Sequence, residues 1–109
     1  MKDDRIYLEH ILDGIGAIRR YTRGGRTPFF ADRMVQKATL RELQEIAEST
    51  QRLSDPFKAA HPKVPWRDIA GFRNVLVHGY LGLNLERVWS VIEYDLAPLQ
   101  EAAELTLKR

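Results

Sequence analysis

The stretch "LEHILDGIGAI" (Leu8–Ile18) carries an apolar stripe that decides the fold of this 109-residue chain. Its leucine and isoleucine side chains recur three or four residues apart, which is the spacing of one face of an α-helix. The members of the stripe are Leu8, Ile11, Leu12, Ile15 and Ile18. Acidic residues precede it and arginines follow it, as suits the two ends of a helix dipole. We therefore predict a helix from about Asp3 to Thr22, which Gly24-Gly25 terminates.

A second long stripe follows this helix. Thr27-Pro28 is typical of an N-cap followed by proline at the first helical position, and Asp32 is a place where the helix is interrupted or restarts. The apolar positions are Val35, Ala38, Leu43, Ile46, Ala47, Thr50 and Leu53. Asp55-Pro56 then opens a short turn, "PFKAAHP", and the later prolines Pro62 and Pro65 predict an extended passage.

Two further helices complete the chain. The third begins near Pro65 or Trp66 and ends near Gly79, with an inner face of Ile69, Phe72 and Leu76. Asn84 is a suitable N-cap for the fourth. The buried face of this last helix is predicted as Leu85, Val88, Trp89, Ile92, Leu96, Leu99 and Ala103. Pro98 lies within it and removes one backbone donor, so we expect a bend near Tyr94–Ala97.

The pattern as a whole predicts an all-α protein. No window shows sustained strand alternation, and four long helices with short links favour an antiparallel four-helix bundle with an extra short helix or turn. The length suits one domain, residues 1–109.

Composition narrows the classes of function. The net charge of +2 permits a nucleic-acid partner without dictating one, and the lack of cysteine excludes disulfides, thiolate catalysis and cysteine-based zinc sites. His10 and His61 have no ligands at zinc spacing, so we predict no metal site. No apolar run reaches the ~18 residues of a membrane span, and the start has no signal-peptide core. We therefore expect a cytoplasmic protein with no membrane contact.

The stretch "RNVLVHGY" (Arg73–Tyr80) places four polar residues in an apolar helix. Asn74 and His78 share a helical face, whereas Arg73 and His78 lie about 140° apart at ~100° per residue. A histidine that titrates near neutral pH and a guanidinium that binds phosphate oxygens suggest cleavage of RNA through its own 2′-hydroxyl. The plain alternative is a core histidine with a satisfied hydrogen bond. Because one histidine cannot easily be base and acid at once, the chemistry predicts a homodimer with its site on the two-fold axis.

The residues around this stretch resemble the HEPN superfamily, specifically its HepT-like toxins. "R-N-x3-H-x-Y" is similar to the Arg-x4-His-x-Tyr signature, and "VPWRDIAGFRNVLVHGY" with "NLERVWSVIEYDLAPL" is similar to its surroundings. "DDRIYLEHILDGI" and "LQEIAES" extend the likeness over nearly the whole chain. One departure is "IAES", where many relatives read Ile-Gly-Glu-Ala, although Glu48 keeps the acidic position.

The resemblance implies a dimeric helical bundle that acts as a metal-independent ribonuclease toxin of a type VII-like toxin–antitoxin system. Arg73 and His78 would be the catalytic pair, with Asn74 assisting. The partner would be an MntA-type nucleotidyltransferase antitoxin, which transfers AMP from ATP to Tyr80. No cofactor is implied apart from AMP as a covalent adduct. The alternative is a non-catalytic helical subunit that presents Tyr80 or a small molecule to a nucleotidyltransferase, and a plain dimer scaffold ranks last.

Three other features allow two interpretations each. The arginines of segment 19–26, with Arg33 not far beyond, either guide an RNA backbone or form a solvated helix end. Glu48 either braces an arginine or histidine of the third helix, as a supporting residue, or lies at the edge of its stripe. Gly71 costs about 1 kcal/mol relative to alanine within a helix, which predicts close approach of another helix from the same chain or a partner.

Overall fold

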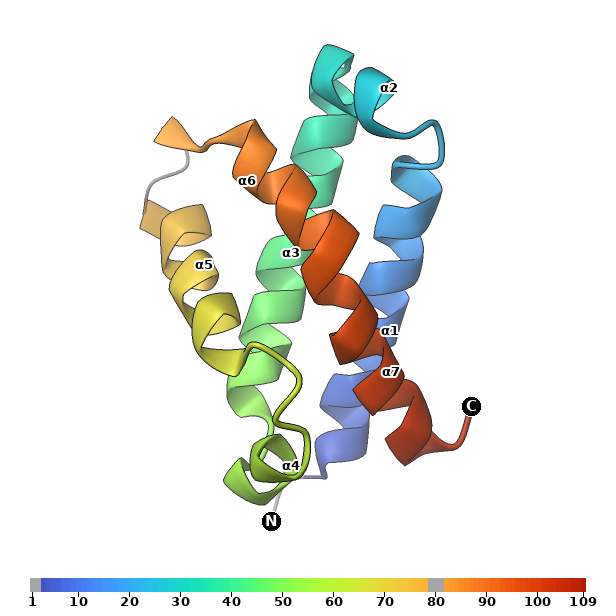
Figure 1. The fold of residues 1–109 in the computed structure, drawn as a ribbon, viewed down its shortest axis with the longest axis vertical. Coiled ribbons are helices and arrows are strands. Elements are labelled where there is room, and N and C mark those ends of the chain that lie inside the picture. The colour runs from blue at the N-terminus through green and yellow to red at the C-terminus, as the bar shows by residue number, and fades with distance from the viewer. Residues whose placement is uncertain (1–2, 79–81) are drawn as a thin grey trace.

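The computed structural model describes residues 3–78 and 82–109, with the side chain of His78 excepted. Helices form all of the regular structure in these ranges, and four long helical segments run antiparallel to their neighbours (Figure 1). The elements are α1 (Asp4–Tyr21), α2 (Arg26–Ala31), α3 (Arg33–Arg52), α4 (Asp55–Ala60), α5 (Trp66–His78), α6 (Leu85–Ser90), the π-helical turn η2 (Val91–Asp95) and α7 (Leu96–Leu107). The all-α bundle predicted from the stripes is confirmed, with α2 and α4 as short additions.

Side-chain caps begin several of these helices. Asp32 closes α2 and opens α3, because its carboxylate accepts hydrogen bonds from the backbone N–H groups of Met34 and Val35 at 2.9 and 3.3 Å. Asn84 caps α6 as predicted, because its side-chain oxygen accepts from the backbone N–H groups of Glu86 and Arg87. Such a cap satisfies donors that a helix terminus otherwise leaves unpaired.

The predicted cap at Thr27 is wrong. Helix α2 begins at Arg26, and Gly25 precedes it with φ +90°, a conformation that glycine adopts without the steric cost of a Cβ. The backbone turn at Gly25 therefore decides where α2 starts, and Thr27 lies inside the helix.

The core lies along α3, which packs against α1 on one side and α5 on the other, while α7 covers α1. The predicted stripes supply most of it. Its most deeply buried side chains are Leu8, Ile11, Ile15, Ile18, Phe29, Val88 and Leu99. None of the helices in the described ranges combines the length and apolar character that a membrane span requires.

The irregularity expected near Pro98 begins earlier than predicted. The backbone N–H of Leu96 reaches back five residues to the carbonyl of Val91, which makes η2 a wide π turn, and α7 then continues through Pro98. Proline has no N–H for the carbonyl four residues before it, that of Tyr94, so regular α-helical bonding is lost there. One extra residue within a helix is the usual form of a π-bulge, and such turns are frequent at functional sites.

Gly14 lies where α1 packs tightly against α3. A Cβ added there would lie 2.8 Å from Cγ1 and 3.0 Å from Cδ1 of Ile46. We expect Gly14→Ala to lower the free energy of unfolding by about 1–3 kcal/mol, because the core must shift to accommodate the methyl group. Gly16→Ala is the matched control: its nearest neighbour would be Arg20 Nη1 at 3.7 Å, so better helix propensity should raise stability by up to about 1 kcal/mol. Urea unfolding measures both, and equal stability of the two variants would contradict the packing assigned to Gly14.

Candidate functional site

Helix α5 carries the polar residues singled out in the sequence. Arg73 is half-buried, and its Nε atom is buried without a hydrogen-bond partner among the described residues. Asn74 is exposed, and His78 is the last residue of the helix. The side chain of His78 and the whole of Tyr80 lie outside the described residues. The structure thus places Arg73, Asn74 and the backbone of His78 on the last turns of one helix, and the predicted meeting of their side chains stays a prediction.

The outer face of α5 is open. Phe72 and Leu76 are buried, whereas Val75 and Val77 are each 39% exposed. A Cβ added at Gly71 would meet nothing within 4 Å. The close approach of a helix from the same chain, predicted at Gly71, is therefore wrong for the described residues. The second option, a partner copy, stays a prediction.

Glu48 lies exposed on α3, at the edge of the buried stripe. It does not bond Arg73 Nε, since that atom has no partner among the described residues. Glu48 therefore lies at the edge of its stripe, which is the simpler of its two interpretations. A role in bracing an arginine or histidine of α5 stays a prediction.

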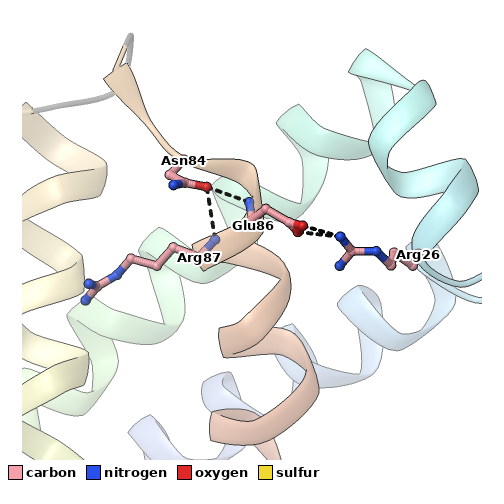
Figure 2. Close-up of polar contacts among 4 residues, drawn as sticks. All are labelled: Arg26, Asn84, Glu86 and Arg87. Atoms are coloured by element: carbon pink, nitrogen blue, oxygen red, sulfur yellow. Dashed lines mark hydrogen bonds and ion pairs between the residues drawn. The ribbon is translucent and has the colours of Figure 1, made fainter.

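The arginine-rich segment is partly engaged within the fold. Arg19 donates from Nη1 to the carbonyl of Ile92 at 3.4 Å, across the bundle. Arg26 forms an ion pair with Glu86 of α6, as Figure 2 shows, and its guanidinium lies 4.5 Å from the centre of the Phe30 ring. The hydrogen bond that Arg26 donates to the Glu86 carboxylate raises the pKa of Arg26 above its usual value. These contacts join α1 and α2 to η2 and α6, and all four arginines of the segment are exposed.

A small charged cleft between α5 and η2 was not foreseen from the sequence. Asp68, Arg87 and Asp95 line it above an apolar floor, and its volume is about 30 Å³, room for one water molecule. Arg87 extends toward α5 in Figure 2, and its guanidinium lies 5.6 Å from the Phe72 ring centre. Burial raises the pKa of Asp95, the nearby Asp68 charge raises it further, and the Arg87 charge lowers it. The π turn brings Asp95 to this cleft, and no short-range sequence signal announces it.

Asp95 gives a pH-dependent prediction. Because the pKa of Asp95 is raised in the folded state, its ionised carboxylate opposes folding. Protonation of Asp95 stabilises the fold. This stabilisation is complete below the unfolded-state pKa of about 3.9 and is lost as the pH rises through the folded-state pKa. We therefore expect Asp95→Asn to be more stable than the parent at pH 7, with the difference shrinking at pH 4. Glu93→Gln, an exposed acid on the same turn, is the control that should show no such dependence. Urea unfolding at both pH values checks this, and a constant difference would contradict it.

Within the ranges that the structure describes, no group of three or more His, Asp or Glu side chains is arranged to hold a metal ion. The polar groups on α5 are those suited to phosphate and proton chemistry, an arginine and an amide beside a histidine position.

Comparison with known proteins assigns the chain to a family. The model of the family described as "Ribonuclease HepT-like" matches residues 11–105. A "Putative RNase" of Caldanaerobacter subterraneus subsp. tengcongensis is 34% identical over 110 residues, covering 100% of this chain and 98% of that protein. A "Probable ribonuclease HepT" of Thermococcus cleftensis is 34% identical over 95 residues, covering 86% of each.

A third relative is longer. The "Gamma-glutamylcyclotransferase and putative RNase" of Methanocaldococcus jannaschii is 34% identical over 101 residues, which are 92% of this chain but 46% of that protein. The chain therefore spans about half of that relative. No solved structure shows a significant match. The family match covers most of the described helices, including all of α5, and the chain belongs to the HepT-like ribonuclease family.

Proposed function

We propose that this chain is a metal-independent endoribonuclease whose active site is completed by α5 of a second copy. The observation that carries the proposal is the position of Arg73, Asn74 and His78 on one helix of a ribonuclease-family chain, beside an outer face that its own described residues leave open. Val75, 39% exposed, and the unoccupied space at Gly71 would let a second α5 approach closely. A second copy would supply the second histidine that acid–base cleavage requires.

The proposed reaction needs no external co-reactant. One His78 takes the proton of the RNA 2′-hydroxyl, and that oxygen attacks the adjacent phosphorus. The bond from phosphorus to the 5′-oxygen breaks, and the leaving oxygen takes a proton from the His78 of the other copy. The products are a 2′,3′-cyclic phosphate and a 5′-hydroxyl. Arg73 stabilises the additional negative charge on the phosphoryl oxygens, and Asn74 orients the phosphate.

We also propose that the activity is that of a toxin silenced by a nucleotidyltransferase antitoxin, which attaches AMP to Tyr80. Tyr80 follows His78 by two residues, so an adduct there would bring bulk and negative charge close to the catalytic group. The negative charge of AMP would repel an RNA phosphate from the neighbouring Arg73 and His78. The two parts of this proposal, cleavage and silencing, are separable by experiment.

Purified protein, expressed without any nucleotidyltransferase, is expected to cleave a labelled single-stranded RNA in the presence of EDTA. The fragments should carry 2′,3′-cyclic phosphate and 5′-hydroxyl ends, and an RNA with 2′-O-methyl groups should stay intact because it lacks the nucleophile. Gel electrophoresis with end-group analysis is the measurement. Intact RNA after prolonged incubation would reject the enzyme and leave the non-catalytic presenting subunit as the better description.

The silencing proposal predicts a mass gain of one AMP on protein co-expressed with a cognate nucleotidyltransferase, confined to the peptide containing Tyr80. The modified protein should lose RNA cleavage, since the adduct occupies the approach to the site. Tyr80→Phe should remain unmodified and keep cleaving under the same co-expression. Modification at another tyrosine, with Tyr80 untouched, would contradict the assignment.

A further inference from the structure

We propose that the groove between α3 and α5 guides the RNA backbone to Arg73, with Arg33 and Arg41 of α3 as its phosphate contacts. This inference rests on the proposed ribonuclease function and names the surface by which the substrate would reach the site. Neither residue belongs to the arginine-rich segment 19–26, the basic cluster most apparent in the sequence.

Helix α3 bears a basic stripe that begins at Arg33 and continues onto the flank that faces α5. Arg33, Lys37 and Arg41 follow one another at intervals of four residues, so their side chains share one side of the helix, and all three are exposed. Lys37 and Arg41, with Gln44, line a hollow of about 170 Å³ whose far wall is Leu76 of α5. Cationic side chains along a groove are the usual means of holding a nucleic-acid backbone.

The stripe leads toward the candidate catalytic arginine. Arg73 precedes Leu76 by three residues on α5, which places it about one helical turn along the same side. Because α3 and α5 pack side by side and run antiparallel, as Figure 1 shows, the basic half of α3 lies against the C-terminal half of α5. Arg73 itself is half-buried, and a guanidinium is a charged donor suited to phosphate oxygens.

The flank of α3 that faces α1 carries the opposite charge. The hollow between α1 and α3 is lined by three carboxylates, those of Asp13, Glu42 and Glu45, beside Arg20. A phosphate chain would be repelled there, although Arg20 and Arg23 lie near that end of the bundle. Helix α3 therefore separates an acidic groove from a basic one, and the basic groove is the one that borders α5.

Arg41 can leave its ion pair with Glu45 to bind a phosphate. It pairs with Glu45 at 3.0 Å through an exposed contact one turn away, with the two side chains 68% and 57% exposed. Exposed pairs of this kind contribute only about 0.3–0.5 kcal/mol, so a phosphate can compete for the guanidinium. The same contact marks the boundary between the two flanks of α3.

Binding of a labelled 2′-O-methyl RNA, measured by fluorescence anisotropy from 50 to 200 mM salt, tests the groove without cleavage. We expect Arg33→Gln/Arg41→Gln to bind about tenfold more weakly and to reduce the slope of log K against log salt by about 1.4, the value for two lost phosphate contacts on a single strand. Arg20→Gln/Arg23→Gln removes the same charge beside the acidic hollow between α1 and α3, and binding should stay within about twofold of the parent. Parental binding by the first pair, or equal loss in both pairs, would overturn the groove assignment.

Glu45→Gln probes the groove in the opposite sense. Loss of this carboxylate frees Arg41, so RNA should bind about twofold more tightly. Glu101→Gln on α7, an exposed acid that lines a separate hollow, changes the net charge equally and should leave binding unchanged. Equal tightening in both variants would assign the effect to net charge and overturn the role of Arg41. If the parent protein neither binds nor cleaves RNA, the proposed ribonuclease function is wrong. If the parent cleaves RNA and Arg33→Gln/Arg41→Gln binds it as tightly as the parent does, only the groove assignment is wrong.

Discussion

Replacement of Arg73 or His78 with alanine is expected to lower the rate of RNA cleavage at least about 100-fold. A positioned general acid or base contributes about 10²–10⁴-fold, and a group that stabilises developing phosphoryl charge contributes a comparable factor. Single-turnover cleavage with enzyme in excess measures the chemical step, and growth of cells that express each variant gives a second measure. Cells that stop growing with the parent protein should grow with either variant.

Arg67→Ala is the matched control for this pair. Arg67 is an exposed arginine at the second position of the same helix, and its loss changes the net charge in the same way as loss of Arg73. It should cleave RNA at the parental rate. Circular dichroism and urea unfolding establish that the inactive variants remain folded. If both alanine variants cleave RNA as the parent does, the site lies elsewhere in the chain.

Phe29→Ala is expected to lower the free energy of unfolding by about 3–5 kcal/mol, the usual cost of truncating a fully buried phenylalanine. Phe29 is 0% exposed, although it comes from the six-residue helix α2, and its ring centre lies 5.2 Å from that of Trp89. Small domains have about 5–15 kcal/mol of stability in total, so the loss is a large part of the whole. Urea unfolding followed by circular dichroism gives the difference.

Phe30→Ala is the neighbouring control. Phe30 is only half-buried, its ring is 6.5 Å from Trp89, and one of its contacts is the guanidinium of Arg26. Its truncation should therefore cost less than half as much as that of Phe29. Equal losses in the two variants would show that α2 does not anchor its turn to the core through Phe29.

Much of the bundle was predictable because helical periodicity is a local property. The stripe of Leu8–Ile18 identified the buried side of α1, and the polar residues Asp32 and Asn84 marked helix starts through bonds to backbone groups only two or three residues away. The start of α2 was missed, since it depends on the positive φ of Gly25, which no periodicity expresses. The π turn over Val91–Asp95 was foreseen only as a disturbance near Pro98, because its position depends on how the last helix packs.

For the candidate site, the sequence by itself determined that Arg73, Asn74 and His78 lie on the same helix, α5. Only the tertiary structure decided which arginines have partners inside the fold. Arg26 meets Glu86 from 60 residues away, and Arg19 meets the Ile92 carbonyl from 73 residues away. Such pairs depend on the rotation and spacing of whole helices, which the entire core determines. The segregation of charge across α3 has the same origin, since a helix has an acidic and a basic groove only once α1 and α5 lie on either side of it.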